Sequence, residues 1–175
     1  MDNQGLSSAK GKMLAREIIE VGMADFKVAS SPNVLVTRGL GSCVGITFYD
    51  PFKKIGAMGH AMLPDINNSK IKSNPGRFVN SSIERILEEL KKEGCIKKHL
   101  QVKIFGGARM FSFIAQDSVL NVGERNVAMA KGVLTGNGIS LAAEDVGGNF
   151  GRTIELDLET GRVHIKTIYS GKKEA

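Results

Sequence analysis

Residues 44–63 read VGITFYDPFKKIGAMGHAML, and this stretch decides the fold. Two apolar runs, 44–49 and 55–63, flank a turn that begins at Asp50-Pro51, a pattern typical of two strands joined by a turn. Because the turn is short, we expect the two strands to pair antiparallel as a hairpin. The residues just before the first strand and those near the end of the second are therefore predicted to be neighbours.

Further strands and two helices are predicted around this hairpin. Short apolar runs punctuated by glycine predict strands over residues 21–29, 34–37, 100–105, 139–144, 153–158 and 162–169. The last three are interpreted as a meander with a hairpin turn at 159–161. Apolar residues at three- and four-residue spacing predict a helix from Val79 to Leu90, ended by Gly94, and a second helix over 125–134. Strands dominate, so the predicted fold class is α+β, with mixed or antiparallel sheet layers and two or three helices.

The length of 175 residues predicts a single domain. Residues 1–20 are expected to form an N-terminal helical arm, because Leu14, Ile18 and Val21 are spaced for one helix face, and residues 21–175 to form the domain. A hydrophobic content of 42% argues against disorder, and two cysteines are too few for a disulfide scaffold.

The chain shows no sign of export or membrane insertion. Its start lacks the basic segment followed by an apolar segment that marks a secretory signal. No apolar run approaches the roughly 18 residues that span a bilayer. We therefore expect a cytoplasmic protein that is not membrane-embedded and whose thiols are reduced.

The net charge of +6 is concentrated in one part of the chain. Residues 70–103 hold nine basic and four acidic residues, so this window carries +5. Two interpretations remain open: a solvated helix face, or a surface that docks an acidic partner. Nucleic-acid binding is not supported, because the chain has no tryptophan, no aromatic residues interleaved with the basic ones and no known nucleic-acid-binding motif.

The segment before the hairpin, Thr37-Arg-Gly-Leu-Gly-Ser-Cys43, combines a thiol with a glycine-rich turn. Glycines two residues apart let the backbone turn sharply and expose its N–H groups. The N–H groups near Ser42 and Cys43 are candidate donors for an oxyanion.

Cys43, His60 and Thr37 are the candidate catalytic residues. The predicted hairpin brings His60 close to Cys43, where an imidazole can act as the base that a cysteine nucleophile needs. The preceding strand puts Thr37 on the same rim, where its hydroxyl can hold the second imidazole nitrogen. The residues alone leave open that Cys43 fills the core and that His60 is structural.

The remaining cysteine and histidines carry no comparable pattern. Cys95 follows a helix-ending glycine and is expected in the core or on inert surface. His99 and His164 lie in charged surroundings and are expected to be solvated. Two cysteines and three histidines without paired ligand spacing predict no metal site.

The Thr37–Cys43 segment followed by His60-Ala-Met-Leu-Pro64 resembles the signature of the CheD family of chemoreceptor glutamine deamidases. The resemblance covers roughly residues 21–168, with residues 1–20 outside it. Later blocks are also similar to the family's: Phe105-Gly-Gly-Ala108, Gly123-Glu-Arg-Asn126, Asp145-Val-Gly-Gly148, Gly151-Arg152 and Thr160-Gly161.

The resemblance implies a function and a set of site residues. The family's catalytic threonine, cysteine and histidine fall on Thr37, Cys43 and His60. The implied reaction is cysteine-dependent deamidation of glutamine side chains on the cytoplasmic helical domain of methyl-accepting chemotaxis receptors, with no metal or organic cofactor. Some family members are also credited with hydrolysis of receptor methyl esters.

The resemblance further implies a fold related to bacterial toxin deamidases with cysteine hydrolase chemistry, and a CheC-type phosphatase as a partner. The alternative is a non-catalytic regulatory module that docks on receptors or on such a phosphatase.

Overall fold

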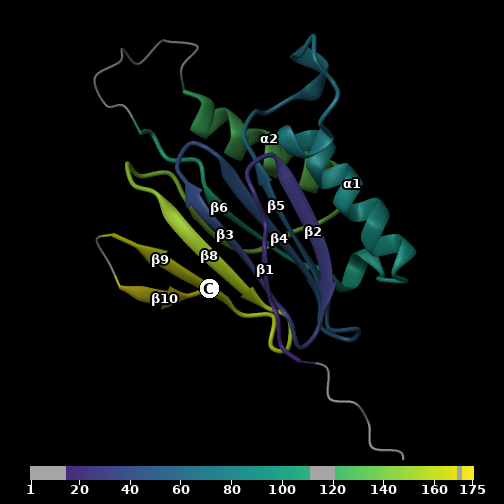
Figure 1. Cartoon of the computed structure of the whole chain (residues 1–175). Helices are drawn as coiled ribbons and strands as arrows, with labels where there is room; N and C mark the ends of the chain where they lie inside the picture. Colours follow the sequence, from purple (N-terminus) through teal and green to yellow (C-terminus); the bar gives the residue numbers. More distant parts are fainter. Residues whose placement is uncertain (1–14, 111–120, 169–170) are drawn as a thin grey trace, which may run out of the picture.

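The computed structural model describes residues 15–110, 121–168 and 171–175, which form three layers (Figure 1). Two helices cover one face of a five-stranded sheet, and a second five-stranded sheet packs against its other face. The sheet under the helices, here called the helix-side sheet, has the strand order β2-β5-β4-β6-β7. The second, called the outer sheet, has the order β1-β3-β8-β9-β10. The predicted α+β class is confirmed.

The helix-side sheet is made of β2 (Asp25–Ser30), β4 (Val44–Asp50), β5 (Ile55–Ala61), β6 (Gln101–Gly106) and β7 (Leu141–Val146). The outer sheet is made of β1 (Ile18–Glu20), β3 (Val34–Leu40), β8 (Arg152–Asp157), β9 (Val163–Thr167) and β10 (Lys172–Glu174). The helices are α1 (Val79–Lys92) and α2 (Val122–Gly136), with short 3-10 turns η1 (Ile66–Asn68), η2 (Pro75–Arg77) and η3 (Lys97–His99).

The predicted central hairpin is confirmed. β4 and β5 pair antiparallel, with Val44 opposite Ala61 at one end and Asp50 opposite Ile55 at the other. β4 also pairs with β6, so it lies in the middle of the sheet, and every one of its residues is buried. A strand buried on both faces is apolar on both, which explains the nearly continuous apolar run.

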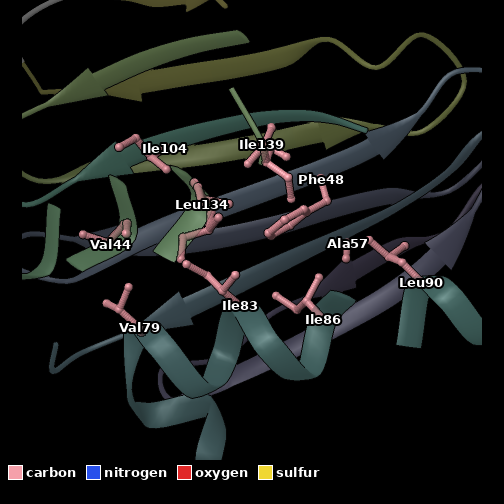
Figure 2. Close-up of a cluster of buried hydrophobic side chains, with 14 of the residues drawn as sticks. Val44, Phe48, Ala57, Val79, Ile83, Ile86, Leu90, Ile104, Leu134 and Ile139 are labelled. Atoms are coloured by element: carbon pink, nitrogen blue, oxygen red, sulfur yellow. The ribbon is translucent and has the colours of Figure 1, made fainter. Parts of the chain in front are cut away.

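The helices bury an apolar face against the helix-side sheet. On α1, Ile83, Ile86 and Leu90 are at most 1% exposed and point toward β4 and β5 (Figure 2). Gly94 has a φ of +75° just after the helix, so the predicted helix and its glycine stop are confirmed. Neither α1 nor α2 is long and apolar enough to cross a membrane, and no other helix of the described residues is either.

A second core fills the space between the two sheets. Side chains alternate across a strand, so the three inner strands of the helix-side sheet, β4, β5 and β6, contribute buried residues to both cores. From β4, β5 and β6 the inter-sheet core receives Tyr49, Met58 and Phe105, which meet buried residues of β3 and β8 such as Leu35 and Leu156. A polar side chain on this inter-sheet face is therefore enclosed between the sheets.

The predicted C-terminal meander is wrong in its first strand. β8 and β9 pair antiparallel as expected, but β7 belongs to the helix-side sheet and runs parallel to β6. The reason is that α2 lies between β6 and β7 in the chain, and a helical crossover returns the chain in the same direction.

The predicted N-terminal helix is wrong for its described end. Ile18–Glu20 forms β1, which pairs parallel with Val34–Val36 of β3. The exposed edge of β3 offers backbone partners that a helix does not use, and the two β-branched isoleucines suit a strand. Residues 1–14 of the predicted arm lie outside the described residues. The strand predicted over 21–29 begins only at Asp25, because residues 21–24 carry the chain from one sheet to the other.

Candidate active site

The three predicted site residues lie in the layer between the two sheets. Side chains two residues apart on a strand share a face. Met58 belongs to the inter-sheet core, so His60 faces the same way from β5. Leu35 places Thr37 on that face of β3 by the same rule, and Cys43 itself packs against the inter-sheet core. Three separate elements therefore direct these side chains into one layer.

A hydrogen bond between Thr37 and His60 joins the two sheets. The Oγ1 atom of Thr37 lies 2.7 Å from Nδ1 of His60 and 2.7 Å from the backbone oxygen of Val21. A carbonyl oxygen can only accept, so the single hydroxyl proton of Thr37 points to Val21 and Oγ1 accepts the Nδ1–H of His60. The other ring nitrogen, Nε2, then carries no proton. It is buried and has no hydrogen-bond partner among the described residues.

Cys43 is the diagonal neighbour of His60. The β4–β5 register pairs Gly45 with His60, and Cys43 precedes Gly45 by two residues. Diagonal neighbours of an antiparallel pair are about 7–8 Å apart, which side chains can bridge. In this structure the Nε2 atom accepts no hydrogen bond from the thiol. Thr37 and His60 are thus in direct contact, and Cys43 lies beside them without a direct bond.

Burial sets the protonation states of the thiol and the imidazole. It raises the pKa of Cys43, and a hydrogen bond from the residue's own backbone N–H opposes this rise. Burial lowers the pKa of His60. At neutral pH the pair is therefore a thiol and a neutral imidazole, and not a thiolate–imidazolium ion pair. A nucleophilic thiol at this place requires a base that takes its proton during attack.

The turn that carries Cys43 is anchored by three consecutive carbonyl groups. The backbone oxygen of Gly41 accepts a hydrogen bond from the N–H of Ala108, and that of Cys43 accepts one from the N–H of Gly107, each at 2.8 Å. The middle oxygen, that of Ser42, accepts from the side-chain amide of Asn126 at 3.0 Å. Residues 106–108 and α2 therefore hold the turn from one side.

Gly106 is required at this anchor. Its φ is +96°, and a β-carbon on it would collide with the backbone oxygen of Cys43. The neighbouring glycine block reinforces the arrangement, because the N–H of Gly147 donates to the oxygen of Gly106 at 2.8 Å. A cavity of about 420 Å³ lies beside the turn, lined by Gly107, Arg109, Glu124, Gly147, Gly148 and Asn149.

Asn126 also contacts the site, although it is not one of the site residues predicted from the sequence. It is fully buried on α2, and its Nδ2 donates to the oxygens of Ser42 and, at 2.9 Å, Met62. One sequence signal could have found it. Asn126 precedes the buried Ala130 and Leu134 by four and eight residues, so it is a polar residue on the apolar face of a helix.

The remaining cysteine and histidines lie outside this site. Cys95 is in the helix-side core as expected, and burial, together with the nearby Asp50, raises its pKa to about 11. His99 and His164 were predicted to be solvated but are half-buried, the first with its ring against Phe52. Within residues 15–110, 121–168 and 171–175, no group of three or more His, Cys, Asp or Glu is placed to hold a metal ion.

The fold and the site together describe an α+β domain of two packed sheets, with a thiol, an imidazole and a hydroxyl enclosed between them. The family described as CheD chemotactic sensory transduction matches residues 62–167 of this chain.

Curated relatives extend this match to most of the chain. A protein from Caldanaerobacter subterraneus subsp. tengcongensis is 50% identical over 157 residues, which are 90% of this chain and 97% of that relative. A protein from Desulforamulus reducens is 47% identical over 89% of this chain and 93% of its own length. One from Pyrococcus abyssi is 45% identical over 91% of this chain and 96% of its own length. All three bear the name "Probable chemoreceptor glutamine deamidase CheD". The chain belongs to the CheD family.

Proposed function

We propose that this protein is an amidohydrolase that converts glutamine side chains of chemotaxis receptors to glutamate. The observation that carries the proposal is the state of His60. Its Nδ1–H is held by Thr37, its Nε2 is unprotonated and has no partner among the described residues, and the Cys43 thiol lies beside it. The names of the curated relatives support the substrate class.

In the proposed first half-reaction, Nε2 of His60 takes the proton of the Cys43 thiol, and the sulfur attacks the carboxamide carbon of the substrate. A C–S bond forms, and the carbonyl oxygen becomes an oxyanion that the backbone N–H groups of Ser42 and Cys43 stabilise. The C–N bond then breaks, and the protonated His60 donates its proton to the leaving ammonia.

In the second half-reaction, a water molecule attacks the thioester while His60 takes one of its protons. The C–S bond breaks, the product leaves as glutamate, and Cys43 regains its proton from His60. Thr37 contributes by keeping the ring in the tautomer that leaves Nε2 free. Its hydroxyl carries no charge, so it stabilises the imidazolium less than a carboxylate would.

The proposed substrate sets the partners and the compartment. Receptor glutamines that are modified for adaptation lie on the cytoplasmic helical domain, so we place the enzyme in the cytoplasm. A CheC-type phosphatase as a second partner stays a prediction from the family resemblance.

The test is to incubate the protein with a receptor cytoplasmic fragment and to map glutamine-to-glutamate conversion by peptide mass spectrometry. Cys43→Ala and His60→Ala should abolish conversion, and Cys95→Ala, the matched control for a cysteine outside the site, should not. Conversion that survives Cys43→Ala would overturn the mechanism. Receptor or phosphatase binding by the wild type without any conversion would instead support the regulatory module.

A further inference from the structure

The side chain of Asn126 has only one orientation that its surroundings accept. Its Nδ2 faces two carbonyl oxygens, at 3.0 Å from that of Ser42 and 2.9 Å from that of Met62. Turning the amide over would set Oδ1 against both oxygens, and an oxygen cannot donate. The observed orientation leaves Oδ1 buried without a partner among the described residues, so the two carbonyls and not Oδ1 determine how the amide lies.

The two carbonyls belong to the two segments that carry the reacting groups. Ser42 is the residue before Cys43, and Met62 is two residues beyond His60. Through one buried amide, α2 therefore holds together the end of the Cys43 turn and the end of β5.

The bond to Ser42 also controls an N–H group. The carbonyl of Ser42 and the N–H of Cys43 belong to the same peptide plane, and in a trans peptide they point in opposite directions. Holding the carbonyl toward α2 therefore directs the N–H of Cys43 away from α2. The N–H of Cys43 also lowers the pKa of its own thiol, so this N–H and the sulfur interact.

The preceding peptide is held in the same way. The backbone oxygen of Gly41 accepts from the N–H of Ala108 at 2.8 Å, so the N–H of Ser42 is directed away from residues 106–108. No acceptor in the described part of the chain receives the N–H of Ser42. Two consecutive N–H groups next to a thiol, both fixed through their carbonyl partners, are candidate donors of a preorganised oxyanion site.

We propose that Asn126 is a positioning residue that sets the oxyanion donor of this site by fixing the Ser42–Cys43 peptide plane. The inference rests on the proposed thiol chemistry but not on the identity of the substrate. A hydrogen bond to a peptide carbonyl also polarises that peptide, which strengthens its N–H as a donor. Asn126 thus acts on the transition state through Cys43 and does not touch the substrate.

Two reactions of Cys43 separate this role from general support of the fold. Alkylation by iodoacetamide displaces iodide at a saturated carbon and forms no oxyanion. Acylation by p-nitrophenyl acetate forms a C–S bond, passes through an oxyanion and releases p-nitrophenolate. Peptide mass spectrometry assigns both products to Cys43, and neither reaction needs a receptor.

Asn126→Asp is the first variant, because it keeps the shape and replaces the donor by an acceptor. We expect acylation to slow by about 10²-fold, as when an oxyanion donor is lost, with alkylation within about threefold of the wild type. With a receptor fragment, kcat should fall by a similar factor while KM stays within about threefold. Asn126→Ala removes both donors without adding charge and should show the same pattern.

Asn137→Asp is the matched control. Asn137 lies at the other end of α2, and its Nδ2 also donates to a backbone oxygen, that of Val133 at 2.9 Å. This variant makes the same chemical change on the same helix but at a residue that does not contact the Cys43 turn. Alkylation and acylation of Cys43 should therefore both keep their wild-type rates.

Equal losses of alkylation and acylation in the Asn126 variants, or no loss of either, would overturn the inference. If Asn126→Asp does not give a cooperative thermal melt, the same comparison is made with Asn126→Ala. Wild-type protein that reacts with both reagents but leaves receptor glutamines unchanged would contradict the proposed function and leave the role of Asn126 standing.

Discussion

Thr37 has one hydroxyl proton, and the use of that proton decides the state of the histidine beside it. Because the proton goes to the oxygen of Val21, the hydroxyl can only accept from His60, so the ring is protonated at Nδ1. No charged side chain is needed for this orientation. Burial, and not a neighbouring carboxylate, then determines the pKa of His60, which is lowered.

At the residue scale, Thr37→Val tests this arrangement. Valine has nearly the same shape but cannot accept a hydrogen bond, so the imidazolium loses a partner and the pKa of His60 should fall further. The base is active when unprotonated. We therefore expect the acidic limb of the kcat/KM profile, which lies below the ordinary histidine pKa of about 6.5, to move to lower pH.

The plateau value of kcat/KM in Thr37→Val should drop by about 10²-fold, because the tautomer of His60 is no longer fixed. The pH dependence of receptor deamidation measures both effects. Thr37→Ser keeps the hydroxyl and should retain the wild-type limb. An unchanged rate and profile in Thr37→Val would contradict the role assigned to the hydroxyl.

At the element scale, an ion pair ties the two sheets together at β7 and β8. Arg152 of the outer sheet donates to Asp145 of the helix-side sheet at 2.9 Å, and its side chain is only 2% exposed. It also donates to the backbone oxygen of Gly147 at 2.9 Å. Burial raises the pKa of Asp145, but the hydrogen bonds from Lys173 and Arg152 outweigh this, so its pKa is lowered.

Asp145→Asn should destabilise the fold at neutral pH by about 3 kcal/mol or more, because it leaves a buried guanidinium without its counter-charge. A carboxylate with a lowered folded pKa stabilises above its unfolded pKa of about 3.9, and this contribution is lost as the pH falls through the folded pKa. The difference in unfolding free energy between the wild type and Asp145→Asn should therefore become smaller as the pH falls below about 3.9 and through the folded pKa of Asp145.

Unfolding by guanidinium chloride at about pH 7 and at about pH 3 measures this difference in unfolding free energy. Glu144→Gln is the neighbouring control, since Glu144 forms an exposed pair with Lys131 and should matter by less than about 1 kcal/mol. A difference for Asp145→Asn that is as large at low pH as at neutral pH would show that the carboxylate charge is not the cause.

At the scale of the whole molecule, the basic window of residues 70–103 is not one surface. α1 separates its two ends by 14 residues, about 20 Å of helix. Arg77 pairs through its backbone oxygen with the N–H groups of Met62 and Leu63, so this end lies next to the strand that carries His60. Lys91, Lys92, Lys97 and Lys98 lie at the other end of the helix, all exposed.

If an acidic receptor surface docks at the candidate site, only the near end of this window should contribute. Lys70→Glu/Lys72→Glu, at two exposed positions on the approach to η2, should raise the KM for a receptor fragment several-fold and weaken its dependence on salt. Lys97→Glu/Lys98→Glu makes the same charge change at the far end and should have little effect. Deamidation measured against ionic strength checks this, and equal effects of both pairs would favour a long-range influence of net charge.

Local patterns in the sequence correctly predicted several elements of this fold. The α1 stripe with its glycine stop, the β4–β5 hairpin and the β8–β9 turn each depend on residues close in the chain, and all three are present. The proximity of Cys43 and His60 was predicted from that hairpin, whereas the contact between Thr37 and His60 joins two different sheets and does not follow from local pattern.

The wrong predictions for the N-terminal helix and for the C-terminal meander share a cause. Ile18–Glu20 is a strand because β3 offers it an edge, and β7 joins β6 because α2 carries the chain across the sheet. The partner strands, β3 for β1 and β6 for β7, are distant in the sequence. The periodicity of the local sequence therefore does not show which strand each segment pairs with.

By itself, then, the sequence determined the secondary-structure elements that rest on local pattern, the candidate thiol, imidazole and hydroxyl, and the family resemblance. Only the tertiary structure decided that two sheets enclose those groups, that the Val21 oxygen determines the tautomer of His60, and that Asn126 holds the turn of Cys43. The physical reason is the range of the interactions. Periodicity and turn chemistry act over a few residues, whereas these contacts join groups 16 and 84 residues apart, and only the packed core selects them.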